Sequence, residues 1–107
     1  MRSSYTAVVE RNVEASGSFR TEPYECGWAS EAIIFVRCLE GSLSGTQAFV
    51  QISPDGMNWC NEGALLDLPG EHKTAFVRST HFGNWLRLTA ELGDRTAKVI
   101  VTLHLKE

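Results

Sequence analysis

The sequence has no long apolar run and no run of basic residues. No stretch approaches the roughly 20 apolar residues that a membrane-spanning helix needs, so no membrane insertion is expected. Lys and Arg are scattered along the chain, and the formal net charge is −3. Nucleic acids and anionic membranes select basic faces, so this charge balance argues against either as a non-specific partner.

Motifs of catalysis and of cofactor binding are also missing. The sequence contains no G-x-S-x-G elbow and no glycine motif that cradles phosphate, and residues 41–45 are better interpreted as a turn. His72, His81 and His104 lack the i, i+2 or i, i+4 spacing of metal ligands. We therefore expect neither an enzyme nor a cofactor. Acidic residues near turns leave calcium binding open as an alternative, although no D-x-D-x-D-G spacing supports it.

Cysteines are few, and a secretory signal is absent. Cys26, Cys38 and Cys60 cannot all pair within one chain, and none has a C-x-x-C spacing. Free and mostly buried thiols are favoured over a bridge from Cys26 to one of the others. The N-terminus carries one basic residue, Arg2, but no apolar stretch of signal-peptide length. These features predict synthesis in the cytoplasm, with action elsewhere only after lysis or as part of a particle.

The composition is that of an ordinary globular domain. Of the 107 residues, 43% are hydrophobic and 21% are charged, which places the chain outside the disordered class. This length allows one core but not a core with a separate catalytic lobe. We therefore treat residues 1–107 as a single domain, of which residues 1–4 are candidates for a flexible N-terminal arm.

A hairpin near the middle organises the rest of the chain. Residues 46–52 show period-two alternation, and a second short strand is expected at residues 57–62. Between them, Pro54 pre-sets its own φ, Asp55 can bond to nearby backbone, and Gly56 can adopt the positive φ that reverses the chain. This combination predicts a β-hairpin.

The length of the hairpin loop decides which way Trp59 points. A three-residue loop with a bulge at Gly56 places Trp59 on the face of Phe49 and Gln51. A four-residue loop places it beside Val50, on the more apolar face. A slip of one residue exchanges the two faces, so both alternatives stay open at this point.

Two further segments have strong strand patterns. Residues 32–36 form a continuous apolar run rich in β-branched side chains, which favours a central strand covered on both faces over a short buried helix. Residues 85–92 and 97–106 alternate cleanly, with Leu86 and Leu88 on the apolar face. Because Gly93 and its neighbours read as a turn, these two segments predict a second hairpin.

Weaker signals complete the expected architecture. Short strands are expected at residues 5–11, 19–21 and 73–79, with a turn at 14–18 and loops at 23–29 and 63–70. Seven or eight short strands at roughly ten-residue spacing, with no helical pattern, are typical of an antiparallel β-sandwich. We expect that fold class, with Greek-key or jelly-roll connections left open.

The hairpin and a later strand together resemble a known pattern. Ser53-x-Asp55-Gly56-x-x-Trp59, followed by Trp85-Leu86-Arg87-Leu88, resembles the S-x-D-G-x-x-W … Y/W-L/I-R-L pattern of discoidin-like and galactose-binding-like β-sandwiches. It is also similar to short β-sandwich proteins of tailed bacteriophages, which decorate capsids or build tails and fibres. Discoidin domains carry a cysteine near each end and binding spikes in the N-terminal half. Neither feature occurs here, so the resemblance favours the phage proteins.

The large aromatic residues are the candidates for contact. Trp59 and Trp85 could serve as sugar-stacking platforms, but packing in the core or between sheets is favoured for both. Tyr24 and Trp28 lie in the irregular segment 23–29. The sequence favours neither exposure nor burial of their side chains there. Tyr24, Trp28 and Trp85 are therefore the candidate contact residues.

These features predict a structural role. We expect a non-enzymatic subunit of a larger symmetric assembly, such as the capsid decoration, tail or fibre of a virion, that also associates with itself. Its contact surface would be an aromatic loop or an edge strand. The alternative is a carbohydrate-binding module that uses Trp28 or Trp85.

Overall fold

The computed structural model describes residues 4–80 and 83–107 of the chain. Within these residues every regular element is a β-strand and every strand pair is antiparallel, so the predicted all-β class is confirmed. The strands are β1 (Ser4–Arg20), β2 (Tyr24–Glu25), β3 (Glu31–Gly41), β4 (Gln47–Ser53), β5 (Cys60–Asp67), β6 (Thr74–Thr80) and β7 (Trp85–Lys106). Among the described residues, no helix is long and apolar enough to cross a membrane.

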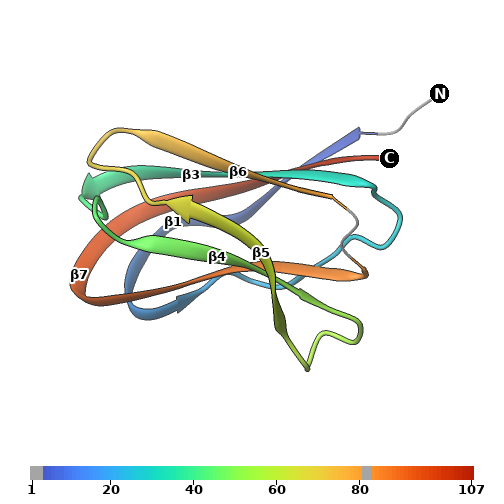
Figure 1. Cartoon of the computed structure of the whole chain (residues 1–107). Coiled ribbons are helices and arrows are strands. Elements are labelled where there is room, and N and C mark those ends of the chain that lie inside the picture. The colour runs from blue at the N-terminus through green and yellow to red at the C-terminus, as the bar shows by residue number, and fades with distance from the viewer. Residues whose placement is uncertain (1–3, 81–82) are drawn as a thin grey trace.

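Strand β7 holds two facing layers together. Its first half, residues 85–92, lies in the first layer, between β4 on one side and β2 with the end of β1 on the other. Its second half, residues 97–106, lies in the second layer between β3 and the longer part of β1. β5 and β6 complete the two layers at their edges and approach each other, so the sandwich is nearly closed into a barrel (Figure 1).

The predicted C-terminal hairpin is wrong. The segments 85–92 and 97–106 pair with different strands and form one continuous strand that curves round one end of the molecule (Figure 1). Gly93, with φ of 61°, lies in this bend, and Gly17 of β1, with φ of 56°, lies in the matching bend of the paired strand. Glycine adopts such angles without steric cost. The Arg95 guanidinium donates a hydrogen bond to the Ser44 carbonyl, which ties the bend to the β3–β4 connection.

Three other boundaries differ from the prediction. The expected strands at 5–11 and 19–21 belong to one long β1, which absorbs the predicted turn at 14–18 through register shifts and the bend at Gly17. The predicted loop at 63–70 is wrong over its first part, because β5 continues to Asp67. Ser4, which was expected to belong to a flexible N-terminal arm, pairs with Lys106, and residues 1–3 lie outside the described residues.

Strand β3 has the expected type but a different burial. Ala32, Ile34 and Val36 are buried, whereas Ile33 and Phe35 on the other face are only half-buried. The rings of Phe76 and His104 flank Phe35 on that outer face, with centroids at 5.7 Å and 5.0 Å. The prediction that β3 is fully covered on both faces is therefore wrong.

The core lies between the two layers and uses the alternate residues of β7 from end to end. Leu86 and Leu88 are each 1% exposed, and each contributes about 1.5–3 kcal/mol through burial. The other buried apolar side chains of β7 are Ala90, Leu92, Ala97, Val99, Val101, Leu103 and Leu105. All three cysteines are free; Cys26 and Cys38 are buried, whereas Cys60 is exposed on edge strand β5.

Candidate functional site

Three aromatic side chains gather at the end of the sandwich where β1 starts and β7 ends. Tyr5 of β1 and Tyr24 of β2 come from different layers. Tyr5 pairs with the buried Leu105 of β7, and Tyr24 pairs with the buried Leu86 of β7. Their ring centroids are 6.3 Å apart, so the two rings cover this end of the core. Figure 1 shows the start of β1 and the end of β7 side by side here.

Trp28 lies beside this pair. With Ser4, Tyr5, Tyr24 and Glu107 it lines an open hollow of about 450 Å³. Tyr5 is 52% exposed and Trp28 is 43% exposed, so much of the aromatic area faces solvent. Partial burial, then the hydrogen bond with Tyr5, raises the pKa of Tyr24. We call Tyr5, Tyr24 and Trp28 the aromatic end.

The turn that presents Trp28 is anchored at both sides. The Cys26 amide donates to the Asn84 carbonyl at 2.6 Å, and the Ser30 amide donates to the Lys106 carbonyl at 2.9 Å. The Ala29 amide closes the turn onto the Cys26 carbonyl at 3.0 Å. Burial of the Cys26 thiol, and then the charge of Glu25, raises its pKa to about 12. Trp28 therefore projects from a turn that is held in place by backbone hydrogen bonds. The Cys26 side chain in the same turn is part of the core.

The β4–β5 loop, which contains the predicted reversal, is organised by two side chains. The Ser53 hydroxyl accepts hydrogen bonds from the amides of Asp55 and Gly56 at 3.2 Å and 2.8 Å. One Asp55 carboxylate oxygen accepts from the amides of Met57 and Asn58, both at 2.9 Å. These backbone donors, with the Asn58 side chain, hold the pKa of Asp55 well below its usual range. Pro54 lies between Ser53 and Asp55 and is exposed.

Gly56 of this loop lies against a predicted contact residue. Gly56 has φ of 81°, and a Cβ built there would lie 3.2 Å from the Trp85 ring. Trp85 is opposite Ser53 and Glu25 in the sheet, and its neighbour Leu86 points into the core. The ring therefore lies half-buried on the outer face of the first layer. The structure brings Tyr24 and Trp28 together but places Trp85 apart from them.

The hairpin loop is longer than either predicted form. Ile52 pairs with Cys60, so residues 53–59 separate the last paired positions. Trp59 lies half-buried on the outer face with the Arg87 guanidinium 4.1 Å above its ring centroid, and Arg87 bonds to Gln51. Trp59 therefore shares the face of Gln51, as the three-residue loop required. The favoured core position for Trp59 and Trp85 is wrong for both.

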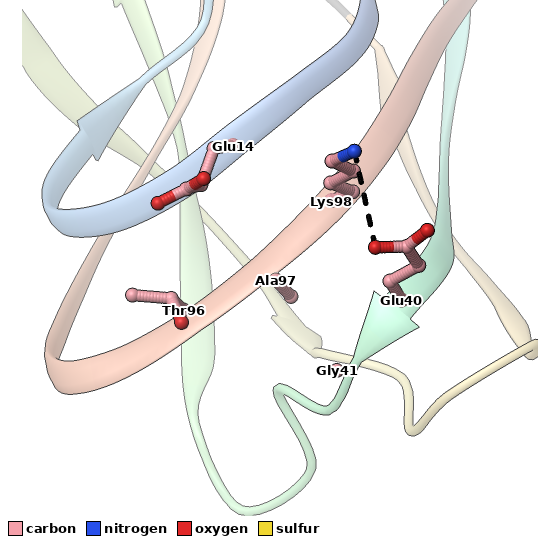
Figure 2. A pocket seen from close by; sticks show the side chains of 6 residues that line it. All are labelled: Glu14, Glu40, Gly41, Thr96, Ala97 and Lys98. Atoms are coloured by element: carbon pink, nitrogen blue, oxygen red, sulfur yellow. Dashed lines mark ion pairs between the residues drawn. The ribbon is translucent and has the colours of Figure 1, made fainter.

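A second, polar hollow lies near the opposite end, where β1 and β7 bend. It holds about 200 Å³ and carries Glu14, Glu40 and Lys98 on three adjacent strands (Figure 2). The Lys98 ammonium lies 3.8 Å from Glu40, while the Glu14 side chain points away from them. Glu14 and Glu40 are exposed, and 44% of the Lys98 side chain is exposed. Ion pairs between such exposed groups contribute little to stability. We interpret this hollow as a solvated sheet surface.

Metal-binding groups do not converge in the part of the chain that the structure describes. No cluster of three or more His, Cys, Asp or Glu side chains occurs there. His72 is exposed beside Glu71, and His104 packs edge-on against Phe35. His81 lies outside the described residues.

Sequence reasoning missed two parts of this surface. Tyr5 appeared only as the start of a weak strand, and its meeting with Tyr24 depends on the pairing of β1 and β2 with the two halves of β7. The contact of Arg87 with Gln51 and Trp59 depends on the β4–β7 register. Period-two alternation of the sequence placed Arg87 on the outer face. Such alternation gives no information about the register between strands.

Comparison with known proteins shows a shared fold. No family model and no curated protein sequence matches this chain. The SPBc2 prophage-derived protein YomS has a similar crystal structure (TM-score 0.62, 10% identity, 100% of this chain and 96% of YomS). The PBSX exported protein XepA is also similar (TM-score 0.69, 8% identity, 94% of this chain), and the chain spans 36% of its length. The chain therefore shares its fold with phage-derived proteins, while the discoidin-like part of the resemblance stays a prediction.

Proposed function

We propose that this protein is a non-enzymatic structural subunit of a phage-derived particle, such as a decoration, tail or fibre component. The fold shared with two prophage proteins supports the class of particle. The aromatic end carries the proposal, since Tyr5 and Trp28 expose 52% and 43% of their surface around one hollow. Aromatic side chains in partly exposed, fixed positions are typical anchors of protein interfaces.

The proposed mechanism is passive association. The aromatic end buries its rings against a neighbouring subunit, either a second copy of this chain or another particle protein. No group has to move, because the anchored turn already holds Trp28 in place. The chain would act within the assembled particle.

The test measures association and particle content. Sedimentation equilibrium should show a concentration-dependent dimer or trimer, and Tyr5→Ser combined with Trp28→Ser should abolish it. Phe76→Ser is the matched control, because Phe76 is 48% exposed on the outer face of the second layer. Mass spectrometry should also find the protein in particles purified after prophage induction. A protein that stays monomeric and is absent from every particle fraction contradicts the proposal.

A further inference from the structure

Three polar side chains form a row across the outer face of the first layer. Asn61 of β5 is opposite Gln51 of β4, which is opposite Arg87 of β7. The Arg87 Nε donates to the Gln51 Oε1 at 2.8 Å, and the Gln51 Nε2 donates to the Asn61 Oδ1 at 3.0 Å. These two bonds fix the orientation of all three head groups. The Asn61 amide nitrogen and the outer nitrogens of Arg87 are then the donors that remain.

Trp59 fixes the plane of the Arg87 guanidinium. Its ring centroid lies 4.1 Å from the guanidinium carbon, which is a cation–π contact. Since Nε is used by Gln51, the two Nη groups stay available as a parallel pair. Among the described residues neither Nη group has a protein acceptor. A paired guanidinium edge of this kind matches the two oxygens of a carboxylate or phosphate.

A second positive charge lies nearby, with no counter-ion among the residues that the structure describes. Arg20 of β1 is exposed opposite Thr89, two residues beyond Arg87 along β7. Partial burial, and then the charge of Arg20, lowers the pKa of Arg87. Glu91 on the same face bonds to Ser18 at 2.6 Å, and in the described part of the chain no carboxylate pairs with either arginine. A bound anion would relieve this repulsion.

Apolar surface borders the donors. Trp85 lies two residues before Arg87 on the same face of β7 and is half-buried against Gly56. Phe49, opposite Thr89, borders the row on its other side. The surface therefore combines a fixed guanidinium, a second cation and an amide donor with aromatic rings. It suits a ligand that has many oxygen acceptors, an apolar ring face and a negative charge.

We propose that this arginine patch, made of Arg20, Gln51, Asn61, Trp59 and Arg87 and bordered by Trp85, binds an anionic saccharide. The two guanidinium groups bind its carboxylate or phosphate, Asn61 donates to a hydroxyl, and a sugar ring packs on Trp85. An acidic peptide fits less well, because its backbone N–H groups need acceptors and the patch offers few. This ligand site lies apart from the aromatic end and goes beyond the structural role proposed above.

The test is a titration of labelled protein followed by two-dimensional NMR. The Nε–Hε signal of Arg87 and the indole signals of Trp59 and Trp85 report on the patch. The probes are digalacturonate, glucose 6-phosphate, neutral maltose, inorganic phosphate and tetraglutamate. We expect saturable shifts with digalacturonate, glucose 6-phosphate or both, which also distinguishes the carboxylate from the phosphate source. Maltose should bind at least tenfold more weakly.

Variants locate the site. Arg87→Gln should raise the dissociation constant at least tenfold, and Arg20→Gln, at an exposed position, should raise it severalfold without affecting the fold. Arg78→Gln is the matched control, because Arg78 is also exposed and lies over an aromatic ring, Phe76, at 5.0 Å, but in the second layer. It should leave the constant unchanged.

Several outcomes overturn the proposal. One is a titration in which neither digalacturonate nor glucose 6-phosphate gives saturable shifts of the patch signals. Another is equal affinity for inorganic phosphate, which means an adventitious ion only, or equal affinity for tetraglutamate, which means an acidic peptide. Loss of binding in Arg78→Gln comparable to that in Arg20→Gln also contradicts it. None of these results depends on self-association, so a failure here is distinct from a failure of the structural role.

Discussion

At the scale of single residues, Gly56 and Asp55 shape the β4–β5 loop for different reasons. Gly56 supplies a positive φ and leaves room for the Trp85 ring, whereas Asp55 satisfies the amides of Met57 and Asn58. The S-x-D-G part of the sequence pattern is thus a device for satisfying backbone donors in a loop. It stabilises the loop.

Replacing Gly56 should destabilise the protein. Gly56→Ala places a Cβ at a φ of 81° and 3.2 Å from the Trp85 ring. The left-handed backbone alone costs about 1–2 kcal/mol of unfolding free energy. Urea unfolding should show this loss, together with a change in tryptophan fluorescence. Gly83→Ala is the control, since a Cβ there meets nothing within 4 Å, and it should lie near the wild type.

Asp55 should give the protein an acid-sensitive component of stability. Its pKa is lowered in the folded state, so the carboxylate favours folding above the ordinary value of 3.8, and this contribution is lost as the pH falls below that value. Asp55→Asn should therefore reduce thermal stability at pH 7 and flatten its fall in acid. Parallel slopes for the variant and the wild type between pH 5 and pH 2 would contradict this assignment.

At the scale of elements, the bend of β7 replaces a turn. A glycine between two alternating segments indicates a change of direction. The same signal fits a hairpin and a single strand that bends from one layer into the other. The two differ in which strands the segments pair with, and long-range pairing leaves no local signal. The sequence therefore predicted which side chains of residues 85–92 and 97–106 face the core. It did not predict which strands these two segments pair with.

The bend should depend on its glycines. Gly93→Ala and Gly17→Ala each impose a left-handed φ on a residue with a Cβ, although no atom lies within 4 Å of either new Cβ. Each change should cost about 1–2 kcal/mol from backbone strain alone. Gly93→Asn should cost less, because asparagine tolerates this region. Denaturant midpoints of the three variants measure the difference, and an alanine as stable as the wild type would show that the bend relaxes.

At the scale of the whole molecule, the two layers should unfold together because β7 belongs to both. Leu88→Ala removes a side chain from the first half of β7, and Val101→Ala removes one from the second half. Leu→Ala at a buried site costs about 2–5 kcal/mol. Both variants should keep one cooperative transition. Coincident fluorescence and circular dichroism curves measure this, and two separated transitions would show that the layers are independent.

The contact surfaces also belong to this scale, and they were the hardest to predict. Tyr24 and Trp28 could be singled out because they interrupt a patterned sequence. Tyr5, Gln51 and Asn61 could not, since each is an ordinary residue of an alternating strand, and Arg87 could be assigned to an outer face but not to its partners. Their proximity arises only when strands distant in sequence are aligned. A single sequence indicates faces and turns, but not the register that builds a site on a sheet.

The pairing of the first and last strands sets how the molecule resists force. Ser4 is opposite Lys106, and β1 runs antiparallel to β7 from that point to the far end. Tension applied through both termini acts across the first hydrogen bonds and opens them one at a time, as in a zipper, instead of loading them all at once in shear. An assembly that must withstand pulling would therefore have to hold this protein by its faces and not by its ends.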